Sequence, residues 1–365
     1  MNTKMNKYID YINNVSGNIL LGCDGFVDET YEIVEVRNSL TDFTAMKNLK
    51  MFGELLVERA DGGVGVELVP KRRCEGGFGI NSGRIAAILG LKPRLPGLYG
   101  KTAIDPAFVE FEDICDLYSL GDPALTIALE FSDGKVLMTN LEAVSSLTWA
   151  DFEKHFTEEQ LKELFSDVDI LGLGYWSLTA DFDNFFKGFM KQYETIKPPR
   201  RMFFDFADIK KKSSESFMKS LELIKAYNSK IPMTLSLNEH EVLELCSRIG
   251  LERPKLSPAT VAAALTVARE KIGFDELVVH TPEFAAASNV ADGEAYAIQE
   301  RQSNVIRSAG AGDSFNGGYM CASLGDLPIK ERLVMANAAT AFFVTQATGP
   351  TKEQLIAQIE KASDK

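Results

Sequence analysis

The stretch RSAGAGDSFNGGY, residues 307–319, places two glycines and an aspartate directly before a segment with helical character. Glycines let backbone N–H groups approach an anion closely because no Cβ intervenes. The N-terminus of a helix adds unpaired donors and the positive end of the helix dipole. This pattern predicts that Gly310, Ala311 and Gly312 can hold a phosphoryl group. The carboxylate of Asp313 would then lie beside it and could take the proton from an attacking hydroxyl.

A simpler interpretation is that Asp313 only caps a helix, since Asp is common at that position and G-x-G alone is weakly diagnostic. Gly317 and Gly318 favour the functional interpretation. Two glycines inside a helix cost roughly 2 kcal/mol relative to alanine, so something must require them. Close packing, the approach of a ligand and a kink would each require glycine, and the sequence leaves these three open.

The composition excludes several classes of partner. The chain has 365 residues, 45% of them hydrophobic, and a net charge of −13. That length can bury one large core, or a core with a smaller appendage. An acidic chain without a basic block is a poor ligand for nucleic acid or anionic membranes, so we expect neither partner.

The cysteines and the N-terminal residues indicate a cytoplasmic location. The five cysteines are scattered without a C-x-x-C pair, which is typical of reduced thiols. The first residues, MNTKMNKYIDYINN, are polar and unlike a signal peptide, and no apolar run approaches the ~20 residues of a membrane helix. The three histidines form no zinc motif.

Alternating strand and helix signals predict an α/β fold. Short apolar runs followed by turns or helical stretches predict buried strands at residues 18–26, 202–206, 233–237 and 276–280. A helix is predicted over residues 257–273, with Ser257 as N-cap, Pro258 at the first helical position and Gly273 at its end. Strands that alternate with helices are typical of a mostly parallel sheet.

Two segments do not fit this alternation. TIALEFSDGKVLMTN, residues 126–140, predicts a hairpin around Asp133-Gly134, and DGGVGVELVP, residues 61–70, predicts irregular β structure. Neither fits inside a doubly wound sheet, so we expect a separate small β element that projects from the core.

Four motifs, in order, resemble those of the ribokinase-like (PfkB) carbohydrate kinases. They are GGFGINSGRIAAILG (76–90), NEHE (238–241), SAGAGDSFNGGY (308–319) and ANAATAFFVTQATGP (336–350). The resemblance spans roughly residues 18 to 350. It implies a three-layer α/β/α core with a mostly parallel central sheet, plus a small β-sheet lid. It also implies a kinase that transfers the γ-phosphoryl group of ATP, with Mg²⁺, to a hydroxyl of a small sugar or sugar acid.

By this resemblance, Asp313 is the base and the N–H groups of Gly310, Ala311 and Gly312 form the anion hole. An ordinary aspartate is already ionised at pH 7, so Asp313 needs no raised pKa to act as the base, and its contribution would come from its position. The resemblance also implies sugar contacts from Asp28, Asp24, Gly76, Gly77 and Asn81. The alternatives are solvated acids after a strand and a tight turn capped by asparagine.

The resemblance implies that Asn238, Asn337 and Thr281 bind the nucleotide. It further implies that Asn238 and Glu241 hold Mg²⁺ through water. Asn238 and Glu241 also fit a helix capping box, and both roles can hold together. Asn337 is equally explained as a buried, satisfied asparagine. The family's glycine-containing loop after Thr281 is replaced by residues 282–284, which leaves the nucleotide preference open.

Two further departures limit the resemblance. Arg307 and Ser308 stand where the family often has Asp-Thr, whose acid often helps to hold a monovalent cation. The positive charge of Arg307 makes a monovalent cation doubtful at this position, so we expect little activation by K⁺. Residues 203–210 (FFDFADIK) depart from the family's D-x-N-x-R pattern and receive no role.

The domain prediction assigns residues 1–28, 71–115 and 146–365 to the core and residues 29–70 and 116–145 to the lid. Such lids often pair between subunits, so a homodimer through the lid is possible on this resemblance. The segment 29–70 is longer than a lid needs. Two other functions stay open: a nucleoside kinase, and a catalytically idle sugar-binding regulatory protein on the same fold.

Overall fold

A nine-stranded sheet forms the centre of the protein in a computed structural model that describes residues 3–325 and 327–363. Its strand order is β14-β13-β12-β11-β10-β9-β1-β5-β6. The strands are β1 (Ile19–Gly22), β5 (Arg94–Gly97), β6 (Asp116–Ser119), β9 (Ile170–Gly174), β10 (Arg201–Asp205), β11 (Met233–Asn238), β12 (Glu276–His280), β13 (Phe284–Asn289) and β14 (Gly293–Ile298). All pairs from β6 to β12 are parallel, and β13 and β14 are antiparallel.

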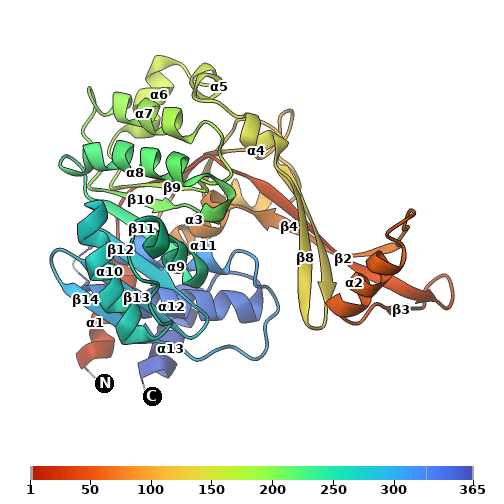
Figure 1. The fold of residues 1–365 in the computed structure, drawn as a ribbon. Coiled ribbons are helices and arrows are strands. Elements are labelled where there is room, and N and C mark those ends of the chain that lie inside the picture. Colours follow the sequence, from red (N-terminus) through yellow and green to blue (C-terminus); the bar gives the residue numbers. More distant parts are fainter. Residues whose placement is uncertain (1–2, 326, 364–365) are drawn as a thin grey trace.

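Helices cover both faces of this sheet, which confirms the predicted three-layer core (Figure 1). One face packs against α5 (Trp149–Lys154), α6 (Glu158–Phe165), α7 (Phe182–Gln192), α8 (Ser214–Asn228), α9 (Glu239–Arg248) and α10 (Pro258–Ile272). The other packs against α1 (Thr3–Asn14), α3 (Phe78–Ile88), α11 (Ala311–Ala322), α12 (Ile329–Gln346) and α13 (Lys352–Ser363). Because both faces are covered, β1 and β9 are buried along their whole length.

The predicted signals of helix α10 are confirmed at both ends. Ser257 is the N-cap, Pro258 begins the helix, and Gly273 ends it in the left-handed conformation with φ of 71°. Short helical segments complete the core: α4 (Glu142–Ser146), η1 (Val109–Phe111) and η2 (Ile209–Lys211).

The two glycines inside α11 are explained by close helix packing. A Cβ on Gly317 would lie 2.6 Å from the carbonyl oxygen of Ser82 on α3. A Cβ on Gly318 would lie 3.0 Å from the Cα of Ala336 on α12. Helix α11 is therefore wedged between its neighbours, which fixes the position of its N-terminus.

The second sheet is the lid, which projects from the core as a long arm (Figure 1). Its elements are β2 (Phe26–Arg37), β3 (Phe43–Ala45), β4 (Leu68–Gly76), β7 (Ala124–Phe131), β8 (Gly134–Asn140) and the helix α2 (Leu49–Glu58). The predicted hairpin is present, with its turn at Ser132-Asp133, one residue earlier than expected. In residues 61–70, regular β structure begins only at Leu68.

The lid differs from its predicted boundaries. Residues 116–119 were expected in the lid but form β6, which pairs with β5 in the core sheet. The turn at residues 121–123 separates this core strand from lid strand β7. Strands β2 and β4 also extend to Phe26 and Gly76, inside the predicted core segments. Residues 1–2, 326 and 364–365 of the predicted core segments lie outside the described residues.

The unexplained length of residues 29–70 builds a small core at the tip of the lid. Helix α2 packs on the lid sheet, and the ring of its Phe52 lies 5.7 Å from that of Phe131. Ile33, Met46 and Leu129 are buried beneath it. The turn of the hairpin is tied to the same helix, since the backbone N–H of Leu49 donates to a carboxylate oxygen of Asp133.

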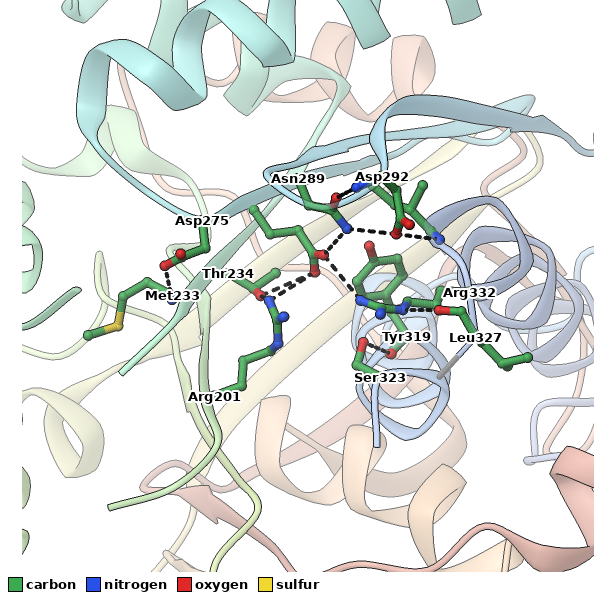
Figure 2. Close-up of polar contacts among 12 residues, drawn as sticks. Arg201, Met233, Thr234, Asp275, Asn289, Asp292, Tyr319, Ser323, Leu327 and Arg332 are labelled. Carbon is green, nitrogen blue, oxygen red and sulfur yellow. Dashed lines mark hydrogen bonds and ion pairs between the residues drawn. The ribbon is translucent and has the colours of Figure 1, made fainter. Parts of the chain in front are cut away.

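A buried carboxylate at the start of β12 connects four neighbouring strands and a helix. This group is the fully buried side chain of Glu276, which contacts Arg201, Thr234, Asn289 and Arg332. Figure 2 labels these four partners. Its oxygens lie 3.4 Å from Nη1 of Arg201 and 3.2 Å from Nη1 of Arg332. Hydrogen bonds from Thr234 and Asn289 complete the cluster. This network fixes β10 to β13 against α12.

Among the residues that the structure describes, no helix combines the length and apolar character that crossing a bilayer requires.

Candidate active site

The strand order predicts where a site can form. Strand β1 lies between β5 and β9. The chain first adds β5 and β6 on one side of β1 and then adds β9 on the other side, so the strand order reverses at β1. A crevice forms at such a switch point, outside the carboxyl ends of the strands. Asp24 follows β1, Tyr175 follows β9, and Asp205, Asn238 and His280 end β10, β11 and β12.

Asp313 lies buried in the first turn of α11 and accepts hydrogen bonds from two other elements. Nδ2 of Asn81 donates to Oδ2 at 3.0 Å. The hydroxyl of Tyr175 lies 3.0 Å from Oδ1 and 2.9 Å from Oδ2. Burial, reinforced by the charge of Asp205, raises the pKa of Asp313 to about 7. Among the described contacts, no lysine or arginine pairs directly with this buried carboxylate. Asp313 is therefore only partly ionised at pH 7, whereas an ordinary aspartate is fully ionised there.

The glycines before Asp313 have defined steric reasons. Gly310 adopts φ of +87°, and a Cβ there would lie 2.7 Å from Nδ2 of Asn81. A Cβ on Gly312 would lie 3.0 Å from Cε1 of His280. Of the three predicted donors, the N–H of Ala311 already donates to the carbonyl oxygen of Ser308 at 3.2 Å. An anion at Ala311 must therefore replace this bond.

Asn81 presents an unused acceptor to the site. The side chain is 2% exposed, and its Oδ1 has no hydrogen-bond partner in the described part of the chain. Such a group is costly to bury unless a ligand donates to it. Gly77 is the N-cap of α3 and has φ of 112°, and a Cβ on Gly76 would lie 2.9 Å from Oδ2 of Asp28. The predicted sugar-contact segment therefore lies beside Asp313, with Asp28 against it.

Asp24 has a different role from the sugar contact that was expected. Its carboxylate accepts the backbone N–H groups of Phe78 at 2.6 Å and Gly79 at 3.0 Å, and it is 2% exposed. It therefore caps the N-terminus of α3. Burial raises the pKa of Asp24 to about 7.

Arg307 is part of a buried ion cluster. Its Nη1 lies 2.7 Å from Oε1 of Glu75, and a second nitrogen donates to the Glu75 carbonyl oxygen. Arg84 binds the same Glu75 carboxylate at 2.5 Å. This cluster joins the lid strand β4, helix α3 and the segment before α11.

A cavity of about 370 Å³ adjoins the start of α11. Its lining includes Asn238, Thr281, Gly312 and Thr340, so two of the residues predicted to bind nucleotide face one cavity. Asn337 is not among the lining residues, and its amide donates to the carbonyl oxygen of Ala297 at 3.3 Å. Oδ1 of Asn337 has no hydrogen-bond partner among the described residues.

Asn238 and Glu241 form the capping box of α9. Oδ1 of Asn238 accepts the N–H of Glu241 at 3.0 Å, and Oε2 of Glu241 accepts the N–H of Asn238 at 2.9 Å. Glu241 is 5% exposed, and burial together with Asp205 raises its pKa. Within the described ranges, no three acidic, histidine or cysteine side chains are grouped closely enough to hold a metal ion directly.

Four residues of the site were not predicted: Lys135, Tyr175, Asp205 and His280. Asp205 lies in FFDFADIK, and Nδ2 of Asn316 on α11 donates to it at 2.6 Å. His280 lines the cavity, and burial lowers its pKa to about 4, so it is neutral at pH 7. Both residues end a buried strand, and this position was the signal that could have identified them.

Comparison with known proteins assigns the family. The family model described as prokaryotic ketohexokinase matches residues 11–362. The chain belongs to this family. A ketohexokinase of Haloferax volcanii is 27% identical over 343 residues, which cover 93% of this chain and 90% of the relative.

Solved structures share the fold. Ribokinase of Arabidopsis thaliana complexed with ribose and ATP superposes with a TM-score of 0.64 at 15% identity, covering 94% of this chain and 98% of the other. A putative ribokinase II of E. coli in complex with ATP and Mg²⁺ gives 0.63 at 15% identity, covering 96% and 99%. The fold is ribokinase-like, and the chain is a carbohydrate kinase, a phosphotransferase with an alcohol group as acceptor.

Proposed function

We propose that this protein transfers the γ-phosphoryl group of ATP to a hydroxyl of a ketohexose. The family and the ketohexokinase of Haloferax volcanii support the acceptor class. The observation that carries the proposal is the junction of Asp313 and Asn81 at the start of α11, where a base, an unused acceptor and helix N–H groups meet. A sugar hydroxyl that donates to Oδ1 of Asn81 would lie next to the carboxylate.

In this mechanism Asp313 takes the proton of the acceptor hydroxyl. The hydroxyl oxygen forms a bond to the γ-phosphorus, and the bond from that phosphorus to the bridging oxygen breaks, so that ADP leaves with the electron pair. The N–H groups of Gly310, Ala311 and Gly312 stabilise the charge on the transferred group. Asp28, beside Gly76, would hold a second hydroxyl of the sugar.

The cavity next to Gly312 is the proposed ATP site. Asn238 and Thr281 would contact the nucleotide there, and the neutral imidazole of His280 adds a polar group without charge. Mg²⁺ bound with ATP would offset the phosphate charges. The carboxylate of Glu241 is buried, and burial together with the charge of Asp205 raises its pKa, so an ion held through water would stabilise its charged form.

Arg307 argues against a role for K⁺. Its guanidinium is 3% exposed and occupied by Glu75, so a fixed positive charge stands where the family often has an acid. A monovalent cation nearby would be repelled. Turnover measured in K⁺, Na⁺ and tetramethylammonium salts at equal ionic strength should be the same, and a large increase in K⁺ alone would contradict this.

We also propose that the lid pairs two subunits. Strand β8 is an edge strand of the lid sheet, and such an edge can pair with another chain. Leu137 and Met138 on this strand are 52% and 47% exposed. Light scattering of the purified protein should give the mass of a dimer, and Leu137→Lys with Met138→Lys should give that of a monomer.

The test of the central proposal is ADP release with Mg-ATP across ketohexoses, aldohexoses, pentoses, ketogluconates and nucleosides. Turnover on ketohexoses, reduced at least ~10²-fold in Asp313→Asn, would support it. Turnover on nucleosides alone would identify a nucleoside kinase. Sugar binding without turnover on any acceptor would indicate an idle sugar-binding protein.

A further inference from the structure

Tyr175 contacts the proposed base more extensively than any other described side chain. Its hydroxyl lies 3.0 Å from Oδ1 and 2.9 Å from Oδ2 of Asp313. A phenol so placed donates to the carboxylate. Asn81 donates to Oδ2 alone, so Oδ1 receives only the Tyr175 contact among the described side chains.

The backbone of Tyr175 is held in a sparsely populated conformation. Its φ is +57°, in the left-handed region that disfavours a bulky residue by roughly 1–2 kcal/mol. Hydrogen bonds maintain this conformation: the N–H of Tyr175 donates to the carbonyl oxygen of Asp205 at 2.8 Å, and its carbonyl oxygen accepts from Leu178 at 2.9 Å and Thr179 at 3.0 Å. Such outliers persist where the surrounding structure fixes them, often at functional sites.

The ring of Tyr175 is fixed from two sides. It packs edge-on to Phe26, the first residue of lid strand β2, with centroids 5.9 Å apart. It also packs edge-on to Phe78, the first residue of α3, with centroids 6.4 Å apart. Backbone, lid and helix α3 thus determine together where the hydroxyl lies.

We propose that Tyr175 is a positioning residue for Asp313, which fixes its carboxylate so that Oδ1 faces the acceptor hydroxyl. This inference rests on the proposed role of Asp313 as base. With Oδ2 bound by Asn81, rotation of the carboxylate is limited at both oxygens. A carboxylate oxygen has a second lone pair, so Oδ1 can still accept the substrate proton beside the Tyr175 hydroxyl.

The charged groups around Asp313 give this inference a measurable consequence. Asp205 at the end of β10 and Asp24 after β1 disfavour its ionisation, whereas Arg307 before α11 favours it. The hydrogen bonds from Asn81 and Tyr175 also lower its pKa. Removing the Tyr175 hydroxyl must therefore raise the pKa of Asp313.

Tyr175→Phe removes the hydroxyl and keeps the ring contacts with Phe26 and Phe78. We expect kcat to fall about tenfold or more at pH 7, while KM for ATP stays within twofold. We also expect the acid limb of the pH–kcat profile to move to higher pH, so that part of the activity returns at pH 9. Tyr8→Phe is the matched control, because Tyr8 on α1 is a fully buried tyrosine whose hydroxyl has no described hydrogen-bond partner.

The acid limb separates positioning from packing, because a merely structural residue would not move it. An unchanged limb and an unchanged kcat in Tyr175→Phe would overturn the inference. If Asp313→Asn is inactive in the same assay, the proposed base survives and only the role of Tyr175 fails. If Asp313→Asn turns over normally, the proposed base itself is wrong.

Discussion

Nζ of Lys135, on lid strand β8, donates a 2.9 Å hydrogen bond to Oγ of Ser308, two residues before Gly310. This contact brings a positive charge from the lid to the segment proposed to bind the phosphoryl group. Burial lowers the pKa of Lys135, and the nearby Asp28 opposes that effect. The lysine therefore links the lid, the sugar side and the phosphoryl side of the site.

Lys135→Met should reduce kcat by ~10- to 10²-fold, because a charge near the transferred group stabilises the transition state more than the ground state. Steady-state kinetics with Mg-ATP and the preferred ketohexose would measure this. Lys71→Met is the control, since Lys71 is a lid lysine whose ammonium pairs with Glu32 and Glu130. Equal kinetics for the two variants would exclude a role for Lys135 in transfer.

The pKa of Asp313 predicts how activity depends on pH. A base works in its deprotonated form, and burial raises this pKa to about 7. The ratio kcat/KM should therefore decline about tenfold per pH unit below pH 7. A profile that stays flat down to pH 5 would show that Asp313 ionises with an ordinary pKa.

The raised pKa of Asp313 also makes stability depend on pH, but stability decreases as pH rises whereas activity increases. Between the unfolded value near 3.9 and the folded value, the folded state holds a proton that the unfolded chain has lost. This contribution to stability decreases as pH rises and is lost above about pH 7. Asp313→Asn carries no such charge, so its Tm should exceed that of the wild type at pH 8 by ~2 °C or more. The difference should shrink as pH falls and vanish below about pH 4, where both states are protonated. A lower Tm for Asp313→Asn at pH 8 would contradict the prediction.

Glu241→Gln should raise the Mg²⁺ concentration needed for half-maximal turnover several-fold, because it removes a carboxylate proposed to hold hydrated Mg²⁺. The capping bond survives in part, since glutamine can still accept the Asn238 N–H. A Mg²⁺ titration of activity measures the effect, and Glu244→Gln, one turn along α9, serves as the control. An unchanged titration would leave Glu241 with the capping role alone.

Glu276→Gln should lower the free energy of unfolding by about 3–5 kcal/mol, because it leaves the Arg201 and Arg332 guanidinium groups without a buried counter-charge. Urea denaturation would measure this against Glu270→Gln, whose carboxylate is exposed. KM for ATP should change little, because Glu276 lies at the start of β12, whereas the cavity lies at the other end of this strand, beside His280. Stability equal to the control would show that the cluster contributes nothing net.

The fold was predictable because its signals are local. The strand runs, the caps of α10 and the four motifs each occupy a few consecutive residues, and together they define a three-layer core with a lid. The boundary error at β6 has a physical cause, because Asp116–Ser119 is a short strand placed by pairing with Arg94–Gly97. Pairing between distant segments leaves no mark in either segment alone.

The site was predictable only in part for the same reason. Asp313, Gly310 and Asn81 lie in motifs, and the structure brings them together. Tyr175 and His280 come singly from the ends of separate strands, so no spacing joins them in the sequence. Asp24 was predicted from its position after a strand, but in the structure its carboxylate accepts the backbone N–H groups at the N-terminus of α3.

The small core at the tip of the lid has a mechanical consequence. Because α2 and the hairpin turn are tied together, the tip of the arm moves as one unit. Any swing of the arm must therefore pivot at its base, where Phe26 pairs with Gly76 and Ala124. Phe26 packs against the ring of Tyr175 at this pivot. A movement that is large at the tip of the arm would therefore reach Tyr175 and Asp313 only as a small displacement.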